Sequence, residues 1–155
     1  MNMNWKALIV IAGVLAPAYA TAAPDGPKYI VAGRSADQSP VPFSEGVLVA
    51  NTLYVAGHIG VDPKTDQAPK DPRVEAKLVM DAVQRTVQSA GLTMDDLVSV
   101  TVYCTELDLY DVFNKTYEGY FHGKYPARAF IGAARLLRGA HFEVQGIAVK
   151  PSVGR

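Results

Sequence analysis

Tyr125 to Val149, YPARAFIGAARLLRGAHFEVQGIAV, is the stretch of the chain that is most informative about its fold. It contains two runs of small, branched and aromatic apolar residues, Ala129 to Ala134 and Phe142 to Val149, which are typical of β-strands. The two runs follow each other closely, so we expect them to form a hairpin that turns near Leu137.

Arg128 and Glu143 are the two residues of this stretch that could act on a ligand. A guanidinium among small apolar residues is costly to desolvate unless an anion meets it, and its fork of N–H groups matches a carboxylate. Glu143 is either an exposed residue on a strand face or a carboxylate that orients a water. In the expected hairpin Glu143 pairs near Gly132, about 13 Å along the strands from Arg128. The two side chains should therefore not touch within one chain, and a shared site needs a bridging substrate or two subunits.

Two helices are expected between the strands. Asp71 caps the first, which has Pro72 at its first position, apolar residues at helical spacing and Gly91 as its stop. Asp108 caps the second helix. The aromatic residues of this helix form a stripe that is typical of a core or of a subunit contact, namely Tyr110, Phe113, Tyr117, Tyr120 and Phe121. The other expected strands are 28–33, 46–50, 53–57 and 98–105, the second and third of which form a hairpin.

This order of elements predicts an α+β domain, a mixed sheet with both helices on one face. Two helices are too few to cover the second face of the sheet as well. We therefore expect a homo-oligomer in which the uncovered faces meet.

The N-terminus, Met1 to Ala22, has the pattern of a secretory signal peptide. Lys6 precedes a short apolar core, and Ala20-Thr21-Ala22 is a small-x-small cleavage pattern. We expect cleavage after Ala22 and a periplasmic or secreted protein; an uncleaved membrane anchor is the alternative. Residues 23–27 are then a linker, and residues 28–155 form one domain.

The composition argues against several function classes. Lys+Arg and Asp+Glu are 15 each, so no basic surplus favours nucleic acid or anionic lipid. The single Cys104 lies on the apolar side of its strand, which favours a buried structural thiol over a nucleophile. The three histidines lack metal-ligand spacing, and no glycine-rich phosphate loop occurs, so we expect neither a metal site nor a phosphate-binding loop.

At these residues the chain resembles the YjgF/RidA family of reactive-intermediate imine deaminases. The resemblance extends over roughly residues 33–150. The motifs that carry it are Tyr125-Pro126-Ala127-Arg128, Ala134-Arg135-Leu136, Phe142-Glu143-Val144 and Ile147-Ala148-Val149. Supporting matches are Pro42-Phe43-Ser44, Val55-Ala56-Gly57, Asp62-Pro63-Lys64-Thr65, Ala90-Gly91-Leu92, and Asn114 with Thr116-Tyr117-Glu118.

The resemblance implies a chorismate-mutase-like fold and a homotrimer with three clefts between subunits. It implies hydrolysis of enamines and imines such as 2-aminoacrylate to a 2-keto acid and ammonia, without metal or cofactor. The expected partners are small 2-imino, 2-keto or amino acids, with no nucleic acid and no membrane after signal cleavage. The family's substrate-carboxylate arginine falls on Arg128, its water-positioning glutamate on Glu143 and its pocket asparagine on Asn114.

Three pocket positions depart from the best-known deaminase pattern and make the cleft more apolar. Phe43 stands where a tyrosine is usual, Ala56 where a serine often lies, and Phe130 where a smaller residue, often cysteine, is found. The lost hydroxyl groups at Phe43 and Ala56 favour the alternative function, a non-catalytic trimer that binds small carboxylates or acts as a stress chaperone in the periplasm. Ribonuclease action is a third possibility, which the neutral charge and the export signal disfavour.

Overall fold

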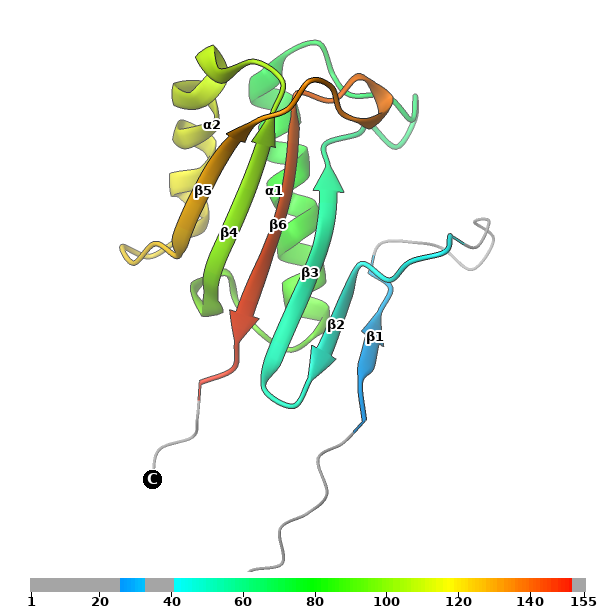
Figure 1. Cartoon of the computed structure of the whole chain (residues 1–155), viewed down its shortest axis with the longest axis vertical. Coiled ribbons are helices and arrows are strands. Elements are labelled where there is room, and N and C mark those ends of the chain that lie inside the picture. Colours follow the sequence, from blue (N-terminus) through cyan, green and yellow to red (C-terminus); the bar gives the residue numbers. More distant parts are fainter. Residues whose placement is uncertain (1–25, 33–40, 152–155) are drawn as a thin grey trace, which may run out of the picture.

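Six strands form one mixed sheet in the computed structural model, which describes residues 26–32 and 41–151 (Figure 1). The order across the sheet is β1-β2-β3-β6-β4-β5, and of the neighbouring pairs only β4 and β5 run parallel. The strands are β1 (Lys28–Ile30), β2 (Gly46–Val49), β3 (Thr52–Ile59), β4 (Leu97–Cys104), β5 (Ala127–Gly132) and β6 (Phe142–Val149). The expected α+β architecture is confirmed. The predicted signal peptide, residues 1–22, lies outside the described residues.

Helix α1 (Pro72–Ser89) begins as the sequence indicates, because Oδ1 of Asp71 accepts a hydrogen bond of 2.9 Å from the Arg73 backbone N–H. Gly91, which follows the helix, has a φ of +78°, a conformation that glycine adopts without steric cost. Asp108 is not the cap of the second helix, so that prediction was wrong. It lies inside a 3₁₀ turn, Leu107–Leu109, and α2 (Tyr110–Tyr117) continues directly from this turn with no side-chain cap.

The expected hairpin between the last two strands is wrong as well. Strand β6 pairs antiparallel with both β3 and β4, and β4 separates it from β5. Residues 133–141 connect β5 to β6 and pass the end of β4, where Ala133 donates to the Cys104 carbonyl and Thr105 to that of His141. This connection is longer than the about two to five residues that join hairpin strands. Its length allows the chain to pass the end of β4, so that β4 lies between β5 and β6 in the sheet.

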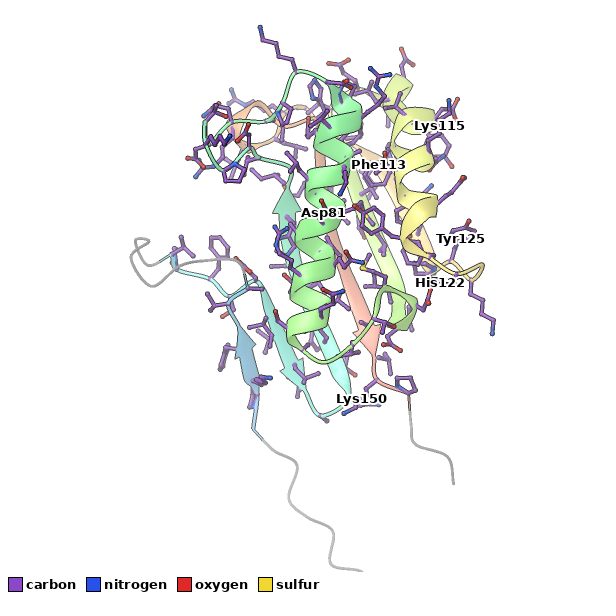
Figure 2. All side chains as sticks on the ribbon, turned by 180° about the vertical axis from the view of Figure 1, so that it is seen from behind. Asp81, Phe113, Lys115, His122, Tyr125 and Lys150 are labelled. Carbon is purple, nitrogen blue, oxygen red and sulfur yellow. The ribbon has the colours of Figure 1, made fainter. Side chains whose placement is uncertain are left out.

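Both helices pack on the same face of the sheet, and no helix among residues 26–32 and 41–151 covers the other face, which we call the uncovered face (Figures 1 and 2). The core buried between the helices and the sheet is mostly apolar, with Glu75 and Thr86 as its buried polar residues. Phe113 of α2 lies there against Phe142 of β6, with ring centroids 5.0 Å apart. Cys104 is fully buried in this core, and burial raises the pKa of its thiol, in agreement with a structural role. No helix among the described residues is long and apolar enough to cross a membrane.

The uncovered face carries apolar and hydroxyl-bearing side chains from β3, β4 and β6. A shallow hollow of about 310 Å³ lies over their middle, lined by Tyr54, Val55, Ser99, Thr101, Gln145, Gly146 and Ile147. Tyr54 is half exposed on this face. A sheet face of this composition is suited to contact with another protein surface.

Candidate functional site

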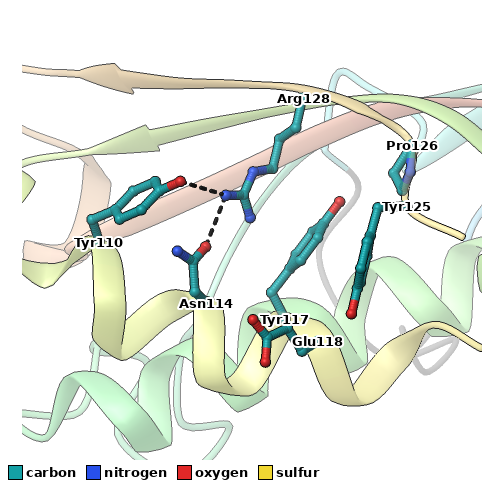
Figure 3. Close-up of a pocket in the computed structure, with 7 residues that line it drawn as sticks. All are labelled: Tyr110, Asn114, Tyr117, Glu118, Tyr125, Pro126 and Arg128. Atoms are coloured by element: carbon teal, nitrogen blue, oxygen red, sulfur yellow. Dashed lines mark hydrogen bonds between the residues drawn. The ribbon is translucent and has the colours of Figure 1, made fainter. Parts of the chain in front are cut away.

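The guanidinium of Arg128 is held between strand β5 and helix α2 (Figure 3). Its Nη2 donates a hydrogen bond of 2.8 Å to Oδ1 of Asn114 and a longer one, 3.4 Å, to the hydroxyl of Tyr110. Tyr110 and Asn114 are four residues apart on α2, so they lie on the same side of the helix, one turn apart. Asn114, named from the resemblance, is therefore brought to Arg128.

Aromatic rings surround the same guanidinium. The Arg128 Cζ atom lies 4.5 Å from the ring centroid of Tyr117, 5.6 Å from that of Tyr110 and 5.8 Å from that of Phe130. Phe130 also packs edge-on against Tyr110, with centroids 5.0 Å apart, so it supports one wall of the site. Cation–π contacts of this kind restrain the plane of the guanidinium without neutralising its charge.

Arg128 has no acidic partner among the described residues. The ion pairs there join Arg73, Lys77, His122, Arg138 and His141 to carboxylates, but none includes Arg128. The side chain is partly buried, so its cost of desolvation is offset only by neutral acceptors and ring faces. Such a site favours the binding of an anion.

A hollow of about 290 Å³ opens beside Arg128, which is close to the lower limit for small-molecule sites. Its lining consists of Tyr110, Asn114, Tyr117, Glu118, Tyr125, Pro126 and Arg128 (Figure 3). The rings of Tyr117 and Tyr125 are roughly parallel, with centroids 6.4 Å apart. The Tyr117 hydroxyl is buried with no hydrogen-bond partner in the described part of the chain, and burial raises its pKa to about 12. This tyrosine is therefore a neutral donor at physiological pH.

Glu143 lies on the opposite face of the sheet from Arg128. Arg128 pairs with Val100 of β4, whose side chain is buried beneath the helices, whereas Glu143 pairs with Tyr103, three residues further along the same strand. Side chains three residues apart on a strand point to opposite faces. The two residues are also separated by about 10 Å along the strands and about 10 Å across them. The prediction that they do not touch within one chain is confirmed, although the predicted register was wrong.

A β-bulge in strand β3 places bare backbone next to Glu143. The pairing register of β3 with β6 shifts between Val55 and His58, whose side chains both face the helices. Two residues, Ala56 and Gly57, lie between them, where a regular strand would have one. A Cβ atom at Gly57 would collide with the Oε1 atom of Glu143, so the carboxylate rests directly on the backbone there. Ala56 thus lies on the Glu143 side of the sheet.

Phe43 belongs to the segment that leads into β2 and is more than half exposed. Two residues later, Glu45 accepts a backbone hydrogen bond from Ala56. Phe43 is therefore two residues from the backbone that pairs with Ala56 of β3, and it does not line the hollow beside Arg128. The residues predicted for one site therefore separate into two groups, which we call half-sites: Arg128 with Asn114 and Phe130 on the helix side, and Glu143 with Ala56 at the uncovered face.

The sequence did not identify the tyrosines of the Arg128 half-site. Tyr110 and Tyr117 were interpreted as part of an apolar stripe, yet they also provide a hydroxyl and a ring to the guanidinium. The signal that could have found them is their spacing, four residues before and three residues after Asn114, which places all three on one side of α2.

The three histidines have separate partners and do not converge on one point. His58 lies 3.1 Å from the Thr86 hydroxyl, His122 2.7 Å from Asp95, and His141 2.6 Å from Glu75. Among the residues with described positions, no three His, Cys, Asp or Glu side chains are grouped as metal ligands.

Comparison with known proteins gives consistent matches over most of the chain. The model of the family described as endoribonuclease L-PSP matches residues 34–150. The chain is 33% identical over 123 residues to the 2-iminobutanoate/2-iminopropanoate deaminase of Escherichia coli K12, which covers 77% of this chain and 96% of that protein. It is 34% identical over 110 residues to a RutC family protein of Sulfurisphaera tokodaii, which covers 70% of this chain and 88% of that protein.

A solved structure similar to this fold is that of E. coli TdcF with bound serine, with a TM-score of 0.72 and 30% sequence identity. The match covers 80% of this chain and all of TdcF.

Proposed function

The chain belongs to the endoribonuclease L-PSP family, also called YjgF/RidA, and from this premise we propose that it hydrolyses small carboxylate-bearing imines and enamines. The products are a 2-keto acid and ammonia. The observation that supports this best is the guanidinium of Arg128, which is fixed by Asn114 and by ring faces and has no acidic partner among the described residues. The name of the E. coli relative supports the choice of an imine.

Substrate binding uses the fork of Arg128. Asn114 accepts from Nη2 at 2.8 Å, and a substrate carboxylate replaces the longer 3.4 Å contact of Nη2 with Tyr110, so that it accepts from the second Nη2 N–H and from the N–H group beside it. The ring of Tyr117 stacks on the guanidinium and restrains its plane, so binding requires little further ordering. Serine bound to TdcF supports a ligand that carries a carboxylate.

The hydrolytic step needs a water next to the imine carbon. An enamine first tautomerises to the imine, as its terminal carbon takes up a proton and its nitrogen gives one up. Glu143 then orients the water, and as the water oxygen bonds to the imine carbon the proton that the water loses passes through Glu143 to the imine nitrogen. The resulting neutral carbinolamine passes its hydroxyl proton to the amino nitrogen as the C–N bond breaks, which gives the keto acid and ammonia.

We place Arg128 and Glu143 of one cleft on different subunits of a homotrimer. The two residues face opposite sides of the sheet in one chain, so a neighbouring copy has to supply the missing half. The uncovered sheet face that carries Glu143, Tyr54 and Ile147 supports such contact, because it is partly apolar and hollowed.

We further propose that the mature protein acts outside the cytoplasm. The support is the pattern of Met1 to Ala22, with its apolar core and cleavage motif. Export predicts that the N-terminus of the mature chain, read by protein sequencing, begins at Ala23.

The test of function measures ammonia and keto acid released from imines that an amino-acid oxidase or a serine or threonine dehydratase generates in the assay. The wild-type chain should accelerate release above the spontaneous rate. Arg128→Ala should lower kcat/KM by about 100-fold, because a charge-assisted pair of hydrogen bonds is lost. Arg85→Ala, at an exposed arginine of α1, is the matched control and should retain full activity. Equal rates for wild type and Arg128→Ala would refute the proposal.

Non-catalytic binding is the second candidate, and the apolar residues Phe43 and Ala56, which replace hydroxyl-bearing residues of the best-known deaminase pattern, favour it. It predicts that 2-keto or amino acids bind through Arg128 while imine release stays at the spontaneous rate. Calorimetric titration with a 2-keto acid, run beside the activity assay, distinguishes the two candidates.

A further inference from the structure

Glu75, in the first turn of α1, is a fully buried carboxylate that holds the beginning of strand β6. Its Oε1 atom accepts two backbone hydrogen bonds, 2.6 Å from His141 N and 2.8 Å from Phe142 N. Its Oε2 atom lies 2.6 Å from Nδ1 of the His141 ring. All three contacts go to the two residues that immediately precede Glu143.

The carboxylate of Glu75 accepts the backbone hydrogen bonds that a neighbouring strand would accept at the beginning of β6. The pairing of β3 with β6 ends at Ile59 opposite Glu143, so the backbone before Glu143 has no partner from β3. Gly60 follows the end of β3, and a Cβ atom there would collide with the backbone carbonyl of Glu75. This glycine therefore lets the first turn of α1 approach closely enough for the Glu75 side chain to reach the N–H groups.

We propose that Glu75 is a positioning residue that fixes the place of the Glu143 carboxylate. The inference rests on the proposed function, in which Glu143 orients the attacking water. Glu143 is restrained from two directions, by Gly57 beneath its carboxylate and by Glu75 through the adjacent backbone. Glu75 itself lies on the helix side of the sheet and does not reach the substrate.

Removal of the Glu75 acceptor would leave two backbone N–H groups without a partner at the end of β6. Buried donors without an acceptor are costly, so this segment would shift until solvent or another group satisfies them. A misplacement of about 1 Å in a reacting group lowers the rate by up to about 100-fold. Arg128 is far from this segment, so binding of the substrate carboxylate should be unaffected.

Three substitutions at position 75 separate the hydrogen bonds from the charge and the volume. Glu75→Gln retains every contact, because the amide oxygen accepts both backbone N–H groups and the NH2 group donates to an unprotonated Nδ1 of His141. Glu75→Asp keeps the charge but is one methylene shorter. Glu75→Met keeps the volume and loses the acceptors. Thr86→Val is the matched control, because Thr86 is an equally buried polar residue of α1 that contacts His58 and Ala82 instead.

The expected result is a loss of kcat with little change in KM. Glu75→Met should lower kcat by about 10- to 100-fold and Glu75→Asp by about 10-fold, with KM within about threefold of wild type. Glu75→Gln should stay within about threefold in kcat, and Thr86→Val should keep its kcat despite a lower stability. Full kcat in a folded Glu75→Met or Glu75→Asp variant would overturn the inference. An increase in KM with an unchanged kcat would overturn it as well. If Glu75→Met does not fold, the aspartate variant decides.

Amide hydrogen exchange separates failure of this inference from failure of the proposed function. If the wild-type chain does not hydrolyse imines, the proposed function fails, but the positioning of β6 still has its own readout. Exchange at His141 and Phe142 should be about 10-fold faster in Glu75→Asp than in wild type and unchanged in Thr86→Val. Unchanged exchange in the aspartate variant would refute the role of Glu75 independently of any activity.

Discussion

Mixing of two inactive variants should restore activity if Arg128 and Glu143 of one cleft belong to different subunits. Arg128→Ala removes the carboxylate-binding group, and Glu143→Gln removes the group that orients water. The prediction follows from the register of β4, which places the two side chains on opposite faces of the sheet. A single chain therefore cannot supply both groups to one cleft.

The size of the recovery follows from the geometry. In a closed oligomer assembled at random from equal amounts, a cleft is intact when one subunit is the Glu143→Gln variant and its neighbour is Arg128→Ala. Each condition holds with a probability of one half, so about a quarter of the clefts recover both groups. The same fraction holds for a symmetric dimer and for a trimer, so the test does not depend on the number of subunits.

The assay unfolds both variants together in denaturant, refolds them, and measures keto-acid release from imines generated in the assay. Native mass spectrometry verifies that subunits have mixed, and variants refolded separately and then combined are the control. Recovery of about a quarter of the wild-type rate supports clefts shared between subunits. A mixed oligomer as inactive as the two parents would refute the shared cleft.

Three further predictions concern residues around the two half-sites. Gly57→Ala should lower kcat by about 10-fold, because its methyl group displaces the Glu143 carboxylate. Gly119→Ala is the control and should keep its kcat, because a Cβ atom there meets nothing within 4 Å. Measurement of kcat in the two variants checks this prediction. Tyr117→Phe should raise the free energy of unfolding in urea by about 1 kcal/mol, because it removes a buried hydroxyl without a partner among the described residues; a loss of stability would contradict this reasoning. Burial lowers the pKa of His58, so the unfolded chain takes up a proton before the folded chain does as the pH falls below about 6.5. Stability should therefore decrease from pH 7 to pH 5, and by less in His58→Gln, as measured by denaturation at each pH.

Local sequence signals predicted most of the elements. The Asp71-Pro72 pair marked the start of α1, and the alternation in β4 placed Cys104 in the core. These signals are local, because a cap and a strand face depend on neighbours within a few residues. Asp108 shows their limit, because a 3₁₀ turn that runs into α2 removes the need for a cap at that position.

The order of the strands could not be predicted in the same way. The runs that became β5 and β6 have apolar patterns that fit a hairpin, and nothing in their residues states that β4 lies between them. That outcome depends on long-range pairing, since β6 joins two antiparallel neighbours while β5 takes the free edge of β4. Glu75 was missed for a related reason. Its three partners are 66 and 67 residues away along the chain, and a glutamate in the first turn of a helix is usually solvated.

In the proposed function, the division into half-sites makes catalysis depend on assembly. Arg128 and Asn114 are held by contacts within one chain, so the carboxylate-binding half exists in a lone subunit. Glu143 is also fixed within one chain, by Gly57 and by the backbone that Glu75 holds. Neither half requires a partner to form, and in the proposed cleft contact between copies brings them together. A variant that weakens subunit contact, such as Ile147→Lys on the uncovered face, should therefore still bind a 2-keto acid weakly through Arg128 while imine hydrolysis is lost. Loss of both together would show instead that the Arg128 half-site forms only in the oligomer.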